Sequence, residues 1–250
     1  MWLRELKQDF KTKKSEECNL NFLWNHNNIY IMDNHLAAAF CWLKSCKQNE
    51  NYNFMHIDQH RDFLCDHSLE EYSQIRTVIT IDDYCALCYK GKPLFRWDNY
   101  IKPMQLIFPK WFSYNVFSTQ QGRVDKTTQL LVPHMCIDYI EPAELEESLD
   151  ELFMQENYLL YTLNKWIVNI DLDVFFDKNC KRLFDDEYIE TLASIINKNM
   201  SRIQVLTLCL SPDCCSDELL EGWDKSISIL NTFCKQIDAL KGKTFPNDYN

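Results

Sequence analysis

Glycine is scarce in this chain, because its 250 residues include only Gly91, Gly122, Gly222 and Gly242. A phosphate-binding loop or a dinucleotide-binding fingerprint needs several closely spaced glycines. No such group can be assembled here, which excludes kinase-like and Rossmann-type cofactor sites.

The chain also has no excess of positive charge and no long apolar run. The formal net charge is -11 and the pI is near 5.0, so phosphate backbones and anionic lipid surfaces would be repelled. No run approaches the roughly 18 apolar residues of a transmembrane helix. We therefore expect neither a nucleic acid nor a membrane as partner, and a cationic partner is favoured.

The twelve cysteines are scattered through a chain whose N-terminus mixes charges and has no secretion-type apolar core. This usage is typical of reduced thiols in the cytoplasm. Cys85 and Cys88 form a C-x-x-C pair, but no second pair at matching spacing exists, so we do not expect a structural zinc site.

The apolar content, 46% of all residues, is enough for an ordinary core, and no linker or repeat divides the chain. We predict one domain over residues 1–250.

Short apolar runs rich in strand formers alternate with helical stretches, which indicates a parallel sheet covered on both faces. The predicted strands are Asn28 to Met32, Asn53 to Ile57, Trp166 to Ile170 and Gln204 to Leu210. The predicted helices are Leu36 to Cys46, Asp185 to Asn199 and Leu219 to Leu240. Residues 81–141, with their Trp and Pro residues, indicate either irregular packing or a substrate-facing insertion.

Polar clusters follow the predicted strands at the points where loops of a parallel sheet converge on a ligand. In Asp58-Gln59-His60-Arg61-Asp62, an extended backbone would direct the alternate side chains to one side. Asp171 and Asp173 repeat the pattern, although helix capping explains that pair equally well. His35 alone would more often be a structural histidine.

A shared site for these residues would be strongly negative. Two acids and an imidazole on one buried side are costly unless something positive neutralises them. Four carboxylates and two neutral imidazoles match the charge of two divalent ions, and such a ligand set suits Mn²⁺ better than a thiol-seeking metal. Two ions bridged by carboxylates would activate water at neutral pH. The proposed ligands are His35, Asp58, His60, Asp62, Asp171 and Asp173.

Three segments, residues 33–35, 58–62 and 171–173, resemble in order and spacing the metal-binding motifs of the ureohydrolase superfamily, which includes arginase and agmatinase. The residues in and around these motifs are most similar to those of the peptide arginases, which convert arginine side chains of ribosomally made peptides to ornithine. The resemblance implies a three-layer α/β/α arginase-like fold with a mainly parallel sheet, and two Mn²⁺ ions. It also implies that His35 and Asp62 serve one metal, that His60 and Asp173 serve the other, and that Asp58 and Asp171 bridge them. Ordinary arginases have Gly-Gly-Asp-His in the first motif, where this chain has Ile31-Met32-Asp33-Asn34-His35.

Hydrolysis of a guanidinium group needs a strong nucleophile, because the cation is planar and delocalised. Asp62 is the candidate that holds the nucleophile and passes its proton to the leaving amine, with His67 as a possible shuttle or a surface histidine. Asp213 is the preferred carboxylate for the substrate cation, with Glu218 second and Asn34 as a further contact. Turn formation and helix capping explain Asp213 and Glu218 as well.

Several activities share this pattern. The expected partner is an arginine-containing precursor peptide, while a small guanidino compound such as free arginine or agmatine is the nearest alternative. A one-zinc deacetylase and a catalytically silent peptide-binding protein of the same fold are the others. The oligomeric state does not follow from the sequence.

Overall fold

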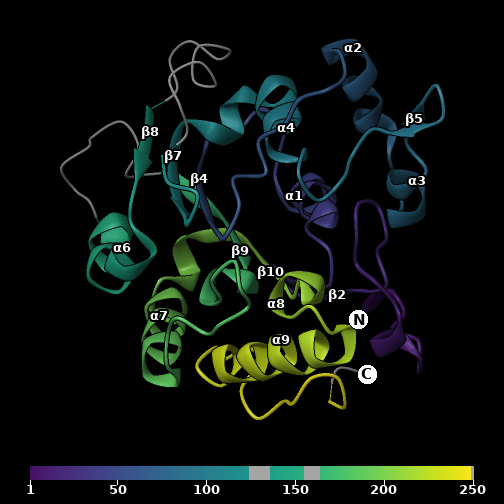
Figure 1. The fold of residues 1–250 in the computed structure, drawn as a ribbon. Coiled ribbons are helices and arrows are strands. Elements are labelled where there is room, and N and C mark those ends of the chain that lie inside the picture. Colours follow the sequence, from purple (N-terminus) through teal and green to yellow (C-terminus); the bar gives the residue numbers. More distant parts are fainter. Residues whose placement is uncertain (124–135, 155–163, 249–250) are drawn as a thin grey trace.

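The computed structural model describes residues 1–123, 136–154 and 164–248 of the chain (Figure 1). Its centre is an eight-stranded sheet in the order β1-β2-β3-β10-β9-β4-β7-β8. Every pairing from β3 to β8 is parallel, and only β1 and β2 at one edge run antiparallel. These strands are β1 (Trp2–Arg4), β2 (Leu23–His26), β3 (Ile29–Met32), β4 (Tyr52–Asp58), β7 (Tyr114–Thr119), β8 (Cys136–Tyr139), β9 (Lys165–Asp171) and β10 (Ile203–Cys209).

Helices cover both faces of the sheet. One face packs against α6 (Leu145–Met154), α7 (Asp186–Lys198) and α9 (Leu219–Cys234), and the other against α1 (Ala38–Ser45) and α4 (Ile101–Ile107), as Figure 1 shows. The shorter helices are α2 (Leu69–Tyr72), α3 (Ile81–Cys85) and α8 (Pro212–Cys215), and a small hairpin joins β5 (Cys88–Tyr89) to β6 (Lys92–Pro93). The 3-10 turns are η1 (Phe10–Thr12), η2 (His35–Ala37), η3 (Ser73–Thr77), η4 (Pro109–Phe112), η5 (Pro142–Glu144), η6 (Leu172–Phe175) and η7 (Met200–Arg202). The predicted three-layer fold with a mainly parallel sheet is confirmed.

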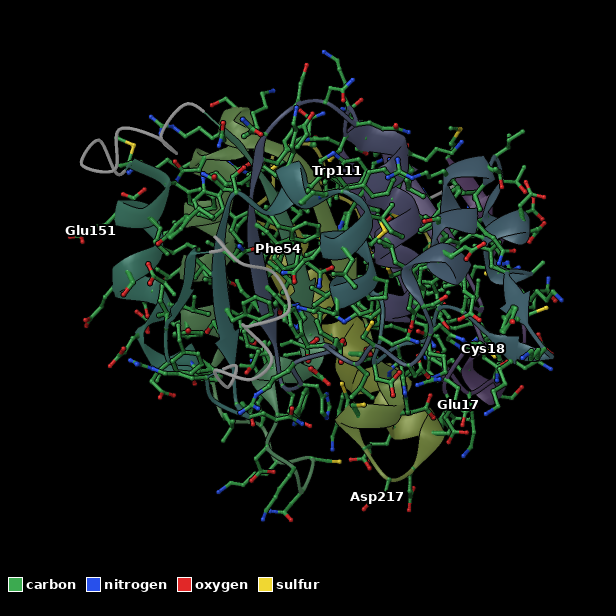
Figure 2. The ribbon with its side chains drawn as sticks, turned by 90° about the horizontal axis from the view of Figure 1, so that it is seen from above. Glu17, Cys18, Phe54, Trp111, Glu151 and Asp217 are labelled. Atoms are coloured by element: carbon green, nitrogen blue, oxygen red, sulfur yellow. The ribbon has the colours of Figure 1, made fainter. Side chains whose placement is uncertain are left out.

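The central strands are apolar because they are buried on both faces. In β4 every residue is buried, and alternate side chains enter two different cores. Met55 and Ile57 join the core under α7 and α9, whereas Phe54 joins the core under α1 and α4. Phe54 and Trp111 lie in the interior in Figure 2, while Glu151 lies at the periphery.

The four predicted strands correspond to β3, β4, β9 and β10, and the three predicted helices to η2 with α1, α7 and α9. The predicted last helix is too long, because α9 ends at Cys234. In the middle of the chain Trp111 and Phe112 are core residues and Trp97 lines a cavity, and the interpretation as a substrate-facing insertion stays a prediction. Residues 124–135 of that region lie outside the described residues.

The sequence predicts that the chain has no transmembrane helix and that its cysteines are reduced. Within the described ranges, no helix combines the length and apolarity needed to cross a bilayer. The cysteines whose side chains the structure describes form no disulfide with one another.

Gly222 is the glycine whose missing side chain matters most for the site. It lies on α9 where this helix crosses α8, and a Cβ atom there would overlap the backbone carbonyl of Pro212. α8 directly follows Ser211, which has a left-handed backbone with φ of 40°. The close contact between the two helices therefore fixes the loop that leaves β10 at its carboxyl end.

We expect Gly222→Ala to push α8 away from α9. Overpacking of this kind lowers the free energy of unfolding by about 1–3 kcal/mol, which for a chain of this size lowers Tm by several degrees. Thermal unfolding followed by circular dichroism tests this. Leu220→Ala on the same helix is the matched control, because Leu220 is 59% exposed, and an equal loss in both variants would contradict the packing explanation.

Candidate metal centre

All six proposed ligands meet at the carboxyl ends of β3, β4 and β9. Nδ1 of His35 lies 3.0 Å from Oδ2 of Asp171, 3.1 Å from Oδ2 of Asp58 and 3.3 Å from Oδ2 of Asp62. Nδ1 of His60 lies 3.1 Å from Oδ2 of Asp173 and 3.5 Å from Oδ1 of Asp58. The structure thus brings together side chains from three segments that are far apart in sequence.

Asp58 lies between the two histidines. Its Oδ2 atom faces His35 and its Oδ1 atom faces His60, which also donates its backbone N–H to Oδ1 at 2.6 Å. A carboxylate with one oxygen toward each imidazole has the orientation that a bridging ligand requires.

The expected extended backbone from Asp58 to Asp62 is wrong. β4 ends at Asp58, and Asp62 has a left-handed backbone with φ of 49°. Aspartate tolerates this conformation better than most residues. The turn, rather than a period of two, brings the Asp62 carboxylate back to His35.

Asp171 has the capping role that the sequence left open, and both Asp171 and Asp173 also lie in the cluster. Asp171 caps η6 by accepting the backbone N–H of Asp173, and it also accepts a hydrogen bond of 2.5 Å from the Ser211 hydroxyl. Asp173 accepts the backbone N–H of Gln59 at 3.1 Å. These contacts join the loops after β9, β4 and β10, so capping and site formation are compatible.

His35 is positioned by the two residues before it. The buried Asp33 carboxylate accepts hydrogen bonds from the backbone N–H groups of Asn21 and Phe22. Asn34 caps the turn through Leu36, and its side-chain amide donates to the backbone oxygen of Ser15 at 2.7 Å. The Asn34 side chain thus holds the loop and does not line the cavity described below, and its predicted substrate contact stays a prediction.

Burial makes this cluster costly without a cation. The Asp58 and Asp173 side chains are fully buried, and Oδ2 of each accepts no hydrogen bond of good geometry. Burial and the neighbouring Asp173 raise the pKa of Asp171 well above its ordinary value, and burial with Asp58 raises the pKa of Asp62 to about 7.

The neighbouring carboxylates also shift the pKa values of the two histidines. Burial would lower the pKa of His60, but the Asp173 and Asp58 carboxylates outweigh it and raise the pKa to about 12. Burial would likewise lower the pKa of His35, and Asp171 with Asp58 and Asp62 raises it well above the usual value. Without a cation the histidines thus hold protons among the carboxylates, and divalent ions would displace these protons. Among the described residues, His35, Asp58 and Asp62 form one of the groups able to hold an ion, and Asp58, Asp171 and Asp173 form another.

A buried polar layer beneath the site was not predicted. The Asn169 amide contacts Nδ1 of His56 and the Tyr100 hydroxyl at 3.0 Å each and Nε2 of His35 at 3.5 Å, and it accepts from Thr207 at 2.6 Å. Burial lowers the pKa of His56 to about 4, so this imidazole is neutral. The available sequence signal was a polar residue within each of two apolar strands, Asn169 in β9 and Thr207 in β10.

A cavity of about 510 Å³ opens onto the cluster. Besides site residues it is lined by Arg61, Phe63, Leu64, Trp97, Asp98, Gln121, Ser211 and Cys214. Trp97 and Asp98 lie far from every motif in the sequence, so no local pattern identified them as cavity residues.

Three predicted residues do not line this cavity. The Asp213 carboxylate accepts the backbone N–H of Ser15 at 2.5 Å, and Glu218 is an exposed residue at the start of α9. Nδ1 of His67 lies 3.5 Å from the Glu71 carboxylate, and its ring contacts Tyr72. The structure thus places these three side chains outside the lining of this cavity, and the roles of Asp213 and Glu218 as substrate contacts and of His67 as a shuttle stay predictions.

No family model and no curated protein match this chain. Among solved structures it is similar to the arginase of Entamoeba histolytica in complex with L-ornithine, with 15% identity and a TM-score of 0.43 over 81% of this chain and 68% of that chain. It is also similar to proclavaminate amidino hydrolase from Streptomyces clavuligerus, with 10% identity and a TM-score of 0.42 over 82% of this chain and 63% of that chain. The chain thus spans about two thirds of the length of either structure. Similarity at this level does not establish function, which has to be inferred from the side chains of the site.

Divalent metal should stabilise the folded protein, because the cluster exists only when the chain is folded. Metal at about 100 times its Kd would add about 2.7 kcal/mol to the free energy of unfolding. We expect Mn²⁺ to raise Tm over a chelated sample, as measured by differential scanning calorimetry.

Asp171→Asn provides the matched variant for this measurement. Asparagine has nearly the size of aspartate and lacks the negative charge that burial disfavours at this position, so the substitution should change the Tm of the chelated protein little. The increase with Mn²⁺ should be lost. Identical Tm values with and without metal in the wild-type protein would contradict the metal centre.

Proposed function

We propose that this chain is a two-metal hydrolase of the ureohydrolase type, which releases urea from the guanidino group of arginine side chains in a ribosomally made peptide. The observation that carries the proposal is Asp58 between His35 and His60, with Asp171 beside the first imidazole and Asp173 beside the second. This arrangement supports two adjacent cation positions that share a carboxylate. His35, Asp58, Asp62 and Asp171 would hold one ion, and His60, Asp58, Asp171 and Asp173 the other, with Mn²⁺ as the metal that suits oxygen and imidazole ligands.

A pair of bound divalent ions would supply Lewis acidity and a strong nucleophile at neutral pH. Asp62 lines the cavity and, with a side chain that is 10% exposed, is more accessible than Asp58 or Asp173. It can therefore accept a proton from the attacking water and deliver it to the departing amine. The polar layer under the site keeps His35 oriented through Asn169.

The substrate cation would be recognised by Asp98 and Trp97. Both line the cavity. Trp97 offers an aromatic face, and the Asp98 carboxylate, which pairs with Arg96 at 3.2 Å, has further acceptor positions for a planar guanidinium. Asp98 replaces Asp213 in this role, because Asp213 faces the N-terminal segment.

The apolar residues that line the cavity support a peptide substrate. Phe63, Leu64 and Trp97 line the cavity with apolar surface, and Leu64 is 55% exposed. Arg61 also lines it, but its guanidinium donates to the backbone oxygens of Gln121 and Gly122. It is thus engaged rather than presented to a substrate carboxylate, and an apolar rim suits the neighbours of an arginine within a chain.

A small guanidino compound is the second candidate. Asp98 lines the same cavity and would also suit the guanidinium of a free compound. Only a comparison of substrates separates the two candidates.

The decisive experiment measures urea release by the Mn²⁺-loaded protein from an arginine-containing peptide, free arginine and agmatine. We expect the peptide to be the preferred substrate, with ornithine in the product and loss of CN₂H₂ in its mass spectrum. Asp58→Asn should abolish the activity and lower the metal content. Activity on free arginine alone would support the second candidate, and an inactive protein with two bound ions would support a silent binding protein.

Asp98→Asn should weaken substrate binding while leaving the metal content unchanged. A hydrogen bond to a charged group contributes about 1.5–3 kcal/mol, so kcat/KM should fall by roughly tenfold or more. Asp66→Asn is the control, because Asp66 pairs with the same Arg96 as Asp98 does and does not line the cavity. An equal fall in both variants would assign the effect to Arg96 and contradict a direct role for Asp98.

A further inference from the structure

A thiol lies beside one half of the metal centre. Cys214, on α8, lines the cavity, and its Sγ forms a group with the ligand atoms of His60 and Asp173 in which all lie within 4.8 Å of one another. The six-ligand assignment contains no sulfur, so this side chain has no role in the function proposed above.

Asp173 provides an independent indication that this group lacks a ligand. Its side chain is completely buried, and Oδ2 lies 3.1 Å from Nδ1 of His60 without a hydrogen bond of good geometry. Oδ1 is already used by the backbone N–H of Gln59. An imidazole, a thiol and a buried carboxylate that has one oxygen without a hydrogen bond form the donor set of a cation site.

We propose that Cys214 is an additional ligand of the ion held by His60 and Asp173, and that this position takes a thiophilic ion such as Zn²⁺ or Co²⁺. This inference rests on the proposed two-metal function and refines its metal assignment. A thiolate is a soft ligand that selects such ions over Mn²⁺. The position at His35 has oxygen and nitrogen donors and keeps the preference for Mn²⁺, so the two halves of the site would differ in the metal they hold.

Cys209 is the alternative source of sulfur. It belongs to a group with His35 and Asp171, at the other half of the site. Cys209 is completely buried, its Sγ lies 3.2 Å from the Ser211 hydroxyl, and it does not line the cavity. The described geometry therefore favours Cys214, which faces the space that an ion and a substrate would enter.

Cobalt provides a direct test, because a Co²⁺–thiolate bond gives a charge-transfer band in the near ultraviolet. The chelated full-length protein is titrated with Co²⁺, and absorbance and bound metal per chain are measured together. We expect two ions per chain and a charge-transfer band in the wild-type protein. Cys214→Ser should lose the band and weaken one of the two sites by at least about tenfold.

Two further variants locate the sulfur. Cys88→Ser should keep the band, which excludes the C-x-x-C pair as its origin, and Cys209→Ser should also keep it. A band lost in Cys209→Ser but kept in Cys214→Ser would overturn the assignment. Far-ultraviolet circular dichroism establishes that each variant is folded, and the wild-type measurement alone can also refute the inference.

The outcomes for the two proposals differ. Two bound ions without a charge-transfer band would overturn the thiolate ligand and leave the two-metal hydrolase intact. Failure to bind any ion would overturn both. With the band present, competition should show that Zn²⁺ displaces Mn²⁺ from one position at a much lower concentration than from the other, and that this difference disappears in Cys214→Ser.

Discussion

The repulsion among buried carboxylates at one end of the sheet is the constraint on which the site depends. Asp58, Asp171 and Asp173 lie within reach of one another and of two histidines, and each is at most 4% exposed. Without a cation, bound protons have to neutralise the cluster. The pKa values of His60 and Asp171 are raised for this reason. Divalent ions would replace those protons, so metal binding and proton release are coupled here.

The fold provides the geometry for this concentration of charge. The carboxyl ends of the parallel strands lie at one edge of the sheet. β4 and β9 are central strands because both of their faces are apolar and buried. Left-handed turns at Asp62 and Ser211 then direct the loops back over the strand ends. Residues in such conformations persist only where the surrounding structure fixes them, and the contact of Gly222 with Pro212 contributes to fixing the second turn.

Much of this could be predicted from the sequence, because the signals were local. Apolar runs identified four central strands, and the acids and histidines that follow three of them identified the cluster. The exact route of the chain after Asp58 could not be predicted, since alternation of residue types does not reveal a positive φ at Asp62.

The residues that line the cavity could not be predicted for a related reason. Asp213 follows a strand and a proline, as a site residue would, but the N-terminal segment at Ser15 occupies its carboxylate. Asp98 follows no strand, and Leu64 donates to its backbone oxygen where two distant loops meet. Tertiary packing decides which of the two acids faces the cavity, and no spacing rule contains that information.

The polar layer beneath the ligands limits how the site can change. Asn169 has contacts with His35, His56 and Tyr100, while its oxygen accepts from Thr207. Because His56 is neutral and its other ring nitrogen lies 3.2 Å from the backbone oxygen of His60, the same network reaches the loops that carry both proposed metal positions. A change of ligand at one position, including the sulfur of Cys214, therefore has to leave this shared layer intact. Cys214 and Asp62 line the cavity instead and lie outside this layer.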